Sequence, residues 1–440
     1  MYRQLRHEGS GDVVHAALEM RTEQQAFPVT EQGRVLIIAQ EGTHRGALAA
    51  SRALSRAGWL VGCGSNDRTS IAGASRGTRH WHRIPSPAGN LDGFVEAVNR
   101  AVADVGYEVI MPGGDAETLA LSATRDRILA HVPYPAHANV IRAFDKLHLA
   151  TEAAKAGLGA PRTALATDSE LERVDGPVVI KARLHWAPGS EHVALRLPTA
   201  LASGRQEAVE QAAHIRAAGG DPVVQQIVAG PIMHCHAAMD RSGRMITCVK
   251  QLSEPLTMPP QGGTRVRSRT VPLEPELGRG VELFLRNLGW YGFASLQFIQ
   301  PDDGPPQLID FNGRLSMSLE QSIAAGTNFP DLWGSIATGR EYGSVPPPRL
   351  GVRFQWLEGD LQRALTERRG GLVHDVVGCL RYARGAVHGV WRKDDVRPGL
   401  RYLTYYLRRI PKRIGLLARA ATIWAHRLTA STKRAVESRG

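Results

Sequence analysis

The sequence feature that most constrains the fold is an alternation of apolar runs and amphipathic stretches near the start of the chain. Val35–Ala39 is a continuous apolar run, typical of a strand that is buried on both faces. Two more such runs, Trp59–Cys63 and Tyr107–Met111, follow helical patterns over Ala47–Ala57 and Leu91–Ala103. Strands that alternate with helices at this spacing predict a parallel sheet with crossover helices.

The pattern after residue 136 differs, because hairpins replace the strand–helix alternation. Two β-rich segments on either side of Asp240–Gly243 predict one hairpin. Phe293–Ile299 and Gln307–Asn312, joined by the turn Asp302–Pro306, predict a second. With helices over Lys146–Ala156 and Leu277–Leu288, this part of the chain is expected to be of the α+β type.

The second hairpin carries an unusual set of polar residues. Asp310, Asn312 and Arg314 alternate, so on a strand their side chains project from one face, and Gln297 lies on the partner strand. Carboxylate and amide oxygens suit a hard cation such as Mg²⁺, and a neighbouring arginine suits a phosphoryl group. The alternative is a surface hairpin with ordinary polar residues.

Two lysines add to this set. Lys181 ends the apolar strand 177–181, where a buried stem would carry its ammonium group to the sheet edge. Lys146 follows Asp145 at a helix start, where the helix dipole disfavours a cation unless an anion lies nearby. Each lysine alone is also compatible with a solvated surface position. Together with the hairpin residues, the two lysines form a set of the kind that binds phosphate groups and a metal ion.

Four segments in order resemble the ATP-grasp superfamily, in particular its carbamoyl-phosphate-synthase-like carboxylate–amine ligases. The first, FDKLHLATEAAKAGLGAPRT (Phe144–Thr163), is similar to the helix that carries the first ATP lysine. The segments PVVIKAR (Pro177–Arg183) and VVQQIVAG (Val223–Gly230) are similar to the strand of the second lysine and to the adenine-holding strand and hinge. The last, Gly289–Trp333, resembles the metal-binding hairpin and the helix after it.

The resemblance implies a reaction and a role for each matching residue. ATP, with Mg²⁺ or Mn²⁺, would activate a small carboxylate as an acylphosphate, which an amine or similar nucleophile then attacks. The implied catalytic residues are Arg314 and Lys181, and the implied metal positions are Gln297, Asp310 and Asn312. The implied ATP-binding residues are Lys146, Lys181, Gln225, Gln226, Ile227 and Val228.

The residue patterns, together with the resemblance, indicate how the chain is divided. We expect a leader over residues 1–33 and a Rossmann-like parallel-sheet domain over 34–135. An ATP-grasp domain would cover 136–345, with a lid at about 164–230. Residues 346–440 would form a helical, basic C-terminal extension. The expected fold class is therefore α/β and α+β, with the ATP-grasp fold as its second domain.

Departures from the family pattern leave a second function open. The family usually has Glu where this chain has Gln226, Gln297 and Asp310. Gln297 removes a formal charge from the metal position, so metal affinity should fall. The segment ARLHWAPGS (residues 182–190) is also a poor match to the Gly-rich phosphate loop. The alternative is an ATP-binding module with weakened or lost catalysis that acts as a nucleotide-dependent sensor or partner protein.

Other candidates carry weaker signals. The loop Gly42–Gly46 follows a strand and opens a helix, but it lacks the GxGxxG spacing, which favours a tight turn over a dinucleotide site. His234 and His236 alternate on a strand without a third metal ligand nearby, which favours packed or substrate-facing histidines. Arg265 and Arg267 fall in the substrate-side segment of the family, with a solvated loop as the alternative.

The net charge of +12 is concentrated at the C-terminal end of the chain. Residues 381–440 contain 15 Lys and Arg against 3 Asp and Glu, whereas residues 1–380 contain 39 basic and 39 acidic residues. Basic and apolar residues interleave over Arg401–Leu428, and Pro411 predicts a break between two helices. The pattern is typical of helices at an anionic membrane surface, and equally of a basic-faced pair packed on the body. Nucleic acid is the least favoured partner, because the body is neutral.

Cysteine usage and hydropathy predict the compartment. The four cysteines (Cys63, Cys235, Cys248, Cys379) lie far apart without CxxC spacing. This favours a reducing, cytoplasmic setting over a disulfide scaffold. No apolar stretch approaches a membrane span, and the polar N-terminal segment is not typical of a signal peptide. We therefore expect a cytoplasmic protein, with peripheral attachment to the inner face of the membrane as an option through residues 381–440.

Overall fold

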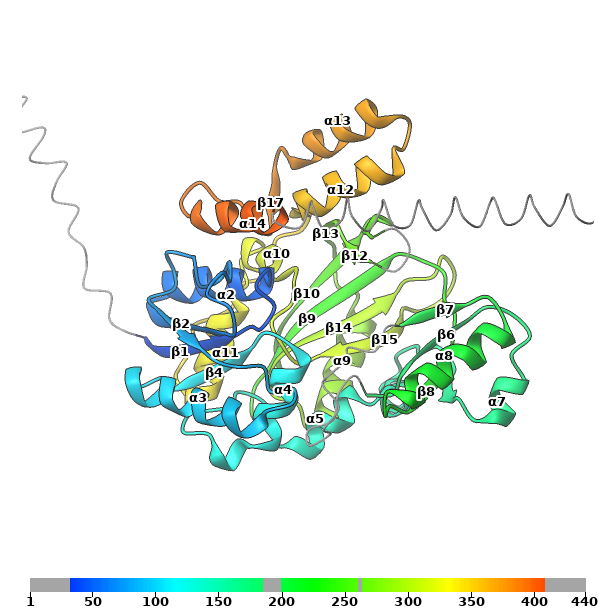
Figure 1. Cartoon of the computed structure of the whole chain (residues 1–440), viewed down its shortest axis with the longest axis horizontal. Coiled ribbons are helices and arrows are strands. Elements are labelled where there is room, and N and C mark those ends of the chain that lie inside the picture. Colours follow the sequence, from blue (N-terminus) through cyan, green and yellow to red (C-terminus); the bar gives the residue numbers. More distant parts are fainter. Residues whose placement is uncertain (1–31, 185–198, 260–262, 408–440) are drawn as a thin grey trace, which may run out of the picture.

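The computed structural model describes residues 32–184, 199–259 and 263–407 of the chain. Three larger sheets lie side by side, with the largest in the middle (Figure 1). The predicted leader, residues 1–33, and the segment after Leu407 lie almost wholly outside the described residues.

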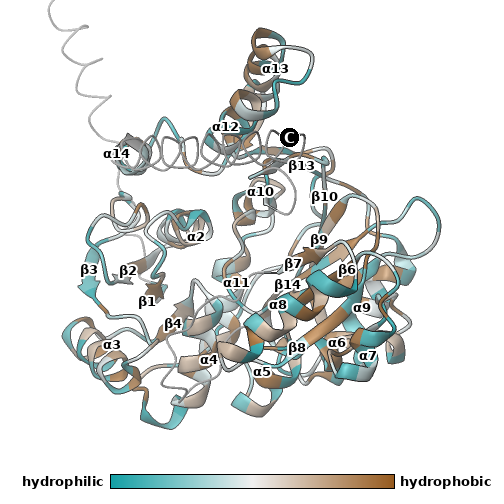
Figure 2. Ribbon diagram, turned by 45° about the vertical axis from the view of Figure 1, so that its right-hand side comes forward, coloured by the Kyte–Doolittle hydropathy of each residue, from teal (hydrophilic) through white to brown (hydrophobic). Residues whose placement is uncertain are grey.

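The first sheet is parallel throughout, as the strand–helix alternation predicts. Its strand order is β3-β2-β1-β4, and β1 lies between β2 and β4. The sequence pattern predicts three of these strands, whereas β3 is short and polar (HWHR; teal in Figure 2) and leaves no apolar signal. The strands are β1 (Gly33–Ile38), β2 (Trp59–Ser65), β3 (His80–Arg83) and β4 (Val109–Pro112). The helices of this part are α2 (Arg45–Arg56), α3 (Leu91–Val105), α4 (Asp115–Ala123), α5 (His137–Phe144) and α6 (Lys146–Lys155).

A smaller four-stranded sheet, in the order β5-β8-β6-β7, coincides with the predicted lid region. Its strands and helices are β5 (Thr163–Leu165), α7 (Asp168–Glu172), β6 (Val178–Ala182), β7 (Ala200–Ala202), α8 (Arg205–Ala217) and β8 (Pro222–Gln226). Ile180, Ala208 and Ile215 belong to an apolar cluster separate from the main core. This sheet therefore packs around a core of its own.

The central sheet has seven strands in the order β15-β14-β9-β10-β13-β16-β17. It contains both predicted hairpins, β9–β10 and β14–β15, which pair through β9 and β14. Its strands are β9 (Ile232–Met239), β10 (Met245–Ser253), β13 (Arg267–Thr270), β14 (Gly292–Ile299), β15 (Gln307–Asn312), β16 (Arg353–Gln355) and β17 (Ala386–His388). A two-stranded ribbon is formed by β11 (Thr257–Met258) and β12 (Thr264–Arg265), which lie between β10 and β13 in the sequence. The helices that follow β13 are α9 (Pro275–Asn287), α10 (Leu319–Ala324), α11 (Phe329–Thr338), α12 (Leu357–Glu367), α13 (Leu372–Ala383) and α14 (Arg397–Leu407).

The described part of the C-terminal extension differs from the expected helical tail. β16 pairs with β13 and β17 pairs with β16, so residues 353–388 contribute two strands to the central sheet. Strands of three residues are too short to show a period in the sequence. A boundary at 346 would therefore divide one hydrogen-bonded sheet. The basic residues after Leu407 lie outside the described residues.

Packing joins the first sheet to the central one. Val35 of β1, Phe293 of β14 and Trp333 of α11 belong to one buried cluster. The indole of Trp59 donates a hydrogen bond to Asp331 at 2.8 Å, which ties β2 to α11. No helix among the described residues is long and apolar enough to cross a bilayer.

Candidate nucleotide-binding site

The β14–β15 hairpin aligns the predicted metal positions. In its antiparallel register, Gln297 lies directly opposite Asp310, and Ser295 lies opposite Asn312. Residues directly opposite in such a pair have side chains on the same face of the sheet. The carboxylate of Asp310 and the amides of Gln297 and Asn312 therefore come together, as the alternation in the sequence predicts.

The two predicted lysines reach this hairpin from different elements. Lys146, the first residue of α6, is buried and forms an ion pair with Asp310. Lys181 of β6 donates a hydrogen bond to the carbonyl of Ile309 at 3.1 Å. Burial, with the positive charge of Lys146 as a smaller cause, lowers the pKa of Lys181 to about 7. The anion that Lys146 needs at a helix start is thus supplied by Asp310.

Local hydrogen bonds hold the start of α6 against β6. Asp145 is the N-cap and accepts from the backbone N–H of Leu147 at 2.9 Å. Its other carboxylate oxygen accepts from Arg183, just after β6, at 2.6 and 2.9 Å. Burial opposes ionisation of Asp145, but the Arg183 guanidinium and the cap hydrogen bonds hold its pKa below the usual value. Because these contacts join the start of α6 to the end of β6, they fix Lys146 and Lys181 relative to each other.

Arg314 is held in place by three oxygen acceptors, one of which is the backbone carbonyl of Leu315 at 3.3 Å. Its Nε donates to Asp115, at the first turn of α4, at 3.0 Å, and a terminal nitrogen donates to Asn312 at 2.9 Å. Burial lowers the pKa of the guanidinium, but the Asp115 carboxylate outweighs it and raises the pKa above the ordinary value. The sequence gives no signal for this role of Asp115, because its partner lies 199 residues away.

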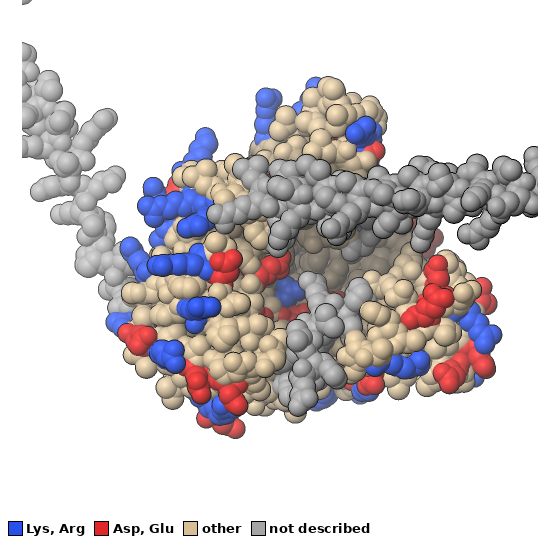
Figure 3. Space-filling view, in the orientation of Figure 1, with Lys and Arg blue, Asp and Glu red and all other residues tan. Residues whose placement is uncertain are grey.

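All of the predicted site residues line one cavity of about 770 Å³. Figure 3 shows the hollow between the first domain and the smaller sheet. Lys146, Lys181, Gln225, Gln226, Ile227, Val228, Gln297, Asp310, Asn312 and Arg314 all contribute to its wall. Gln225 is buried and donates to Thr163 at 2.8 Å, whereas Gln226 is exposed. Residues 185–190 of the predicted phosphate loop lie outside the described residues.

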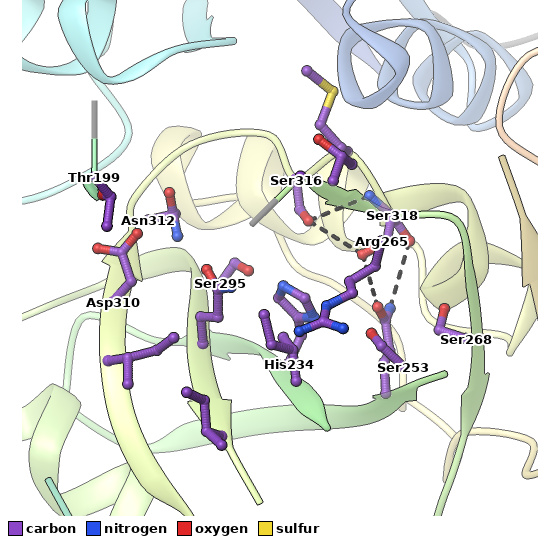
Figure 4. A pocket seen from close by; sticks show the side chains of 18 of the residues that line it. Thr199, His234, Ser253, Arg265, Ser268, Ser295, Asp310, Asn312, Ser316 and Ser318 are labelled. Atoms are coloured by element: carbon purple, nitrogen blue, oxygen red, sulfur yellow. Dashed lines mark hydrogen bonds between the residues drawn. The ribbon is translucent and has the colours of Figure 1, made fainter. Parts of the chain in front are cut away.

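Two of the weaker sequence candidates, His234 and Arg265, also line the cavity. Figure 4 shows Arg265 reaching toward His234, with Ser295 between His234 and the pair Asp310 and Asn312. Among the described residues, the buried Nε of Arg265 has no hydrogen-bond partner. Burial, and then the charge of Arg265, lowers the pKa of His234 to about 4, so this imidazole is neutral. Arg45, the first residue of α2, also lines the cavity and stacks on Trp356, 4.1 Å from the ring centroid.

The remaining sequence candidates serve the fold. His236 is buried, and its two ring nitrogens lie 2.9 Å from the hydroxyls of Ser322 and Ser316. Arg267 binds Asp360 at 2.6 Å and stacks on Tyr382 instead of lining the cavity. No three His, Cys, Asp or Glu side chains within the described ranges are arranged to hold a metal ion.

The loop before α2 is a tight turn that lets two segments approach closely. A Cβ at Gly46 would lie 2.3 Å from the backbone carbonyl oxygen of Ser316. Glycine is therefore needed at position 46 because the start of α2 contacts the segment that follows β15. This contact supports the interpretation of the loop as a tight turn and not as a dinucleotide site.

Comparisons with known proteins match the architecture. No protein-family model matches the sequence, and no curated protein matches it either. Among solved structures, the N5-carboxyaminoimidazole synthetase from Staphylococcus aureus superposes with a TM-score of 0.57 at 13% identity, covering 77% of this chain and 86% of the other. The L-amino acid ligase from Bacillus licheniformis gives 0.55 at 15% identity, covering 72% and 78%. The biotin carboxylase domain of the 2-oxoglutarate carboxylase of Hydrogenobacter thermophilus gives 0.56 at 18% identity, covering 73% of each chain.

These neighbours have the ATP-grasp fold, and the described chain has it too. The predicted fold class is confirmed: a parallel-sheet domain precedes a mixed α/β region of ATP-grasp architecture. At such low sequence identity the likeness establishes the fold, and the function has to be argued from the cavity.

Proposed function

We propose that the protein is an ATP-dependent ligase that activates a small carboxylate as an acylphosphate for attack by an amine or similar nucleophile. The observation that carries the proposal is that two lysines, an arginine and a carboxylate–amide cluster from four separate elements line one cavity. The similar structures include ligases and a structure described with MgADP and bicarbonate bound, which is consistent with this chemistry.

In this proposal the ATP phosphates lie beside Lys146 and Lys181. Gln225, Gln226, Ile227 and Val228 line the adenine end of the cavity at the end of β8. A triphosphate offers oxygens that compete with Asp310 for Lys146, and its charge favours protonation of Lys181, whose pKa of about 7 leaves it only partly charged at neutral pH. Both lysines would then neutralise the nucleotide.

The hairpin residues fit a divalent cation that binds together with a nucleotide. Gln297, Asp310 and Asn312 supply oxygen donors of the kind that Mg²⁺ or Mn²⁺ prefers, but only Asp310 is a carboxylate. Mg²⁺ commonly binds through one or two carboxylates plus substrate phosphates. These three residues would hold the cation, whose chemical contribution when bound is to neutralise charge on the phosphates.

The residues of the chain then act mainly by positioning and charge. An oxygen of the substrate carboxylate attacks the γ-phosphorus of ATP, and the bond between this phosphorus and the bridging oxygen breaks. ADP departs, and the substrate is now an acylphosphate. The amine nitrogen attacks the acyl carbon, the carbon–oxygen bond to phosphate breaks, and the amine loses a proton to solvent. Arg314, held by Asp115, would stabilise the negative charge on the transferred phosphoryl group.

A second candidate function is an ATP-binding module that has lost turnover. The observation that favours it is the single carboxylate at the metal position, because Gln297 lies directly opposite Asp310 and Asp310 is already paired with Lys146. Such a protein would bind nucleotide without consuming it, as a sensor or partner protein.

The first experiment measures nucleotide binding and phosphate release. Isothermal titration with ATP, with Mg²⁺ or Mn²⁺ present, should give a binding signal that Lys146→Met abolishes. A panel of small carboxylates with amines is then screened for ADP and phosphate release. Absence of nucleotide binding under all these conditions would refute both functions.

The second experiment separates the two functions through the variant Gln297→Glu. Gln307→Glu is its matched control, because it adds the same charge to the same hairpin outside the cavity. Turnover by the unmodified protein supports the ligase and excludes the sensor. Turnover only in Gln297→Glu, with Gln307→Glu inactive, supports the sensor.

Partners and compartment follow from the same proposal. ATP, a small carboxylate and an amine are the proposed ligands. The cysteines Cys63, Cys235, Cys248 and Cys379 are all free and buried, which is consistent with the proposed cytoplasmic setting. Attachment of residues 381–440 to an anionic membrane at the inner face stays a proposal that rests on their charge.

A further inference from the structure

The α12–α13 hairpin, which projects from the body in Figure 1, encloses charged residues in its interior. Arg363 of α12 is almost fully buried and donates to Asp375 of α13 at 2.6 and 3.0 Å. Its Nε also donates to Asp360 at 3.0 Å, and Asp360 is fully buried. The ion pair of Arg363 and Asp375 therefore links the two helices inside the hairpin.

The aliphatic residues of the same hairpin point outward. The exposed fractions are 57% for Leu365, 40% for Leu372, 76% for Val373, 37% for Val377 and 51% for Leu380. Val373, Val377 and Leu380 are spaced i, i+4, i+7 and so form one stripe along α13. Burying charges and exposing aliphatic side chains reverses the usual pattern of a helix at the surface of a protein. Such an exposed apolar face indicates a surface that binds something.

Arginines border this apolar face. Arg368, Arg369, Arg381 and Arg384 are all exposed. Within residues 357–384, all of which the structure describes, the acids Glu358, Asp360, Glu367 and Asp375 are buried or only half-buried. In Figure 3, blue side chains flank the tan surface of the projecting hairpin. We call the five aliphatic residues and these four arginines the hairpin tip.

Charge distinguishes among the surfaces that could cover the hairpin tip. A second copy of the chain would place the same four arginines against each other. Residues 408–440 carry nine Lys and Arg against one Glu, so they too would bring like charge. An anionic bilayer offers both an apolar interior for the aliphatic stripe and negative headgroups for the arginines.

We propose that the hairpin tip docks on an anionic lipid surface, with Val373, Val377 and Leu380 entering the headgroup region. The site is separate from the cavity. Val396, directly before α14, and Leu400 and Leu403 on this helix repeat the pattern, since they are exposed at i, i+4, i+7. The basic residues 408–440 follow α14 in the sequence.

The test is co-sedimentation of the full chain with phosphatidylcholine vesicles, with and without phosphatidylglycerol. Val373→Asp should lower binding to the anionic vesicles at least tenfold, because a carboxylate then faces the headgroups. Leu129→Asp is the matched control, since Leu129 is 67% exposed on the first domain. Equal losses in the two variants, or equal binding to both vesicle types, would overturn the proposal.

The arginines are tested separately from the aliphatic stripe. Arg381→Gln and Arg384→Gln should each lower binding about fivefold, because a basic residue near an anionic surface contributes about that factor. Arg279→Gln on α9 is the control, since Arg279 is exposed at a distant helix. No change in either tip variant would refute the electrostatic part of the proposal.

A third measurement detects contact of the hairpin tip with lipid, independently of residues 408–440. The native cysteines are buried, so a polarity-sensitive thiol dye can be placed at Val373→Cys or, as the control, at Leu129→Cys. The dye at position 373 should shift to shorter wavelength with anionic vesicles, whereas the dye at 129 should not. A shift that appears without lipid as protein concentration rises would indicate self-association and overturn the proposal.

Discussion

Lys181 is the residue in the cavity whose charge depends most strongly on its surroundings. Its pKa of about 7 lies below the 10.5 of an ordinary lysine, chiefly because it is buried. Between these two values the unfolded chain binds a proton that the folded chain does not, so this group makes stability rise with pH across the window. Below about pH 7 both states are protonated, and the full cost of burying the charge is present.

The first prediction follows from this window. Lys181→Met removes the titrating group while it keeps most of the side-chain volume, so the variant should be more stable than the parent near about pH 6, and this advantage should shrink toward about pH 10. Melting temperatures measured across that range check it. A stability difference between Lys181→Met and the parent that does not depend on pH would contradict the lowered pKa of Lys181.

A second prediction concerns the half-buried ion pair of Arg314 and Asp115. Asp115→Ala leaves the guanidinium without its carboxylate, and the loss of a hydrogen bond between charged groups costs about 1.5–3 kcal/mol of unfolding free energy. Adding Arg314→Met should recover most of that loss, because no unpaired guanidinium then remains in the cavity wall. Urea denaturation of the two single variants and the double variant measures the coupling, and strictly additive losses would contradict it.

These two residues also show how far sequence reasoning reaches at this scale. Arg314 is predictable because it lies on the same strand period as Asp310 and Asn312. Asp115 is not, because its role depends on which distant segment packs against it. The roles assigned to the ten predicted residues stay predictions, although the cavity brings all ten together.

At the level of elements, long apolar runs and hairpins are predictable, and short strands are not. The patterns around Val35–Ala39 and Phe293–Ile299 correspond to β1 and β14 within a few residues. β16 and β17 have three residues each and form one end of the central sheet, so pairing with β13 and with each other, rather than local pattern, determines them. The contact between α2 and the segment after β15 is equally non-local.

The third prediction tests that contact. An alanine at position 46 would stabilise α2 by up to about 1 kcal/mol from helix propensity alone, but its Cβ would clash with the Ser316 carbonyl. Overpacking against backbone costs about 1–3 kcal/mol, so Gly46→Ala should be destabilising overall. Gly42→Ala is the control, because a Cβ there meets nothing within 4 Å. A melting temperature of Gly46→Ala at or above that of Gly42→Ala would contradict the clash.

At the level of the whole molecule, the segment after β17 returns to the first domain. Asp395 accepts from Arg52 of α2 at 2.9 Å and from the hydroxyl of Ser75 at 2.6 Å. Arg392 nearby binds Glu320 of α10 at 3.0 Å. Residues 390–395 thus connect the parallel-sheet domain to the central sheet. Sequence reasoning treats the whole region after 346 as an appendage, because charge composition does not reveal buried ion pairs.

The last prediction is that Asp395 holds this connection through its charge. Burial opposes ionisation of Asp395, but hydrogen bonds from Ser75 and Arg52 outweigh it and keep its pKa below the ordinary value of 3.8. A carboxylate with a lowered pKa contributes stability that is present above the unfolded pKa and is lost as pH falls through the folded one. Asp395→Ala leaves Arg52 buried without its carboxylate, so it should cost about 3 kcal/mol at neutral pH.

The exposed neighbour Asp394 provides the control for this variant. Asp394 also pairs with an arginine, Arg392, but its side chain is 61% exposed, and exposed pairs contribute at most about 1 kcal/mol. Asp394→Ala should therefore change stability little, and added salt should weaken its contribution while leaving that of Asp395 intact. Urea denaturation at low and high salt measures both. Equal losses in the two variants would mean that the C-terminal segment is held by its apolar contacts, with Val390 and Tyr402 in the core, and not by the buried carboxylate.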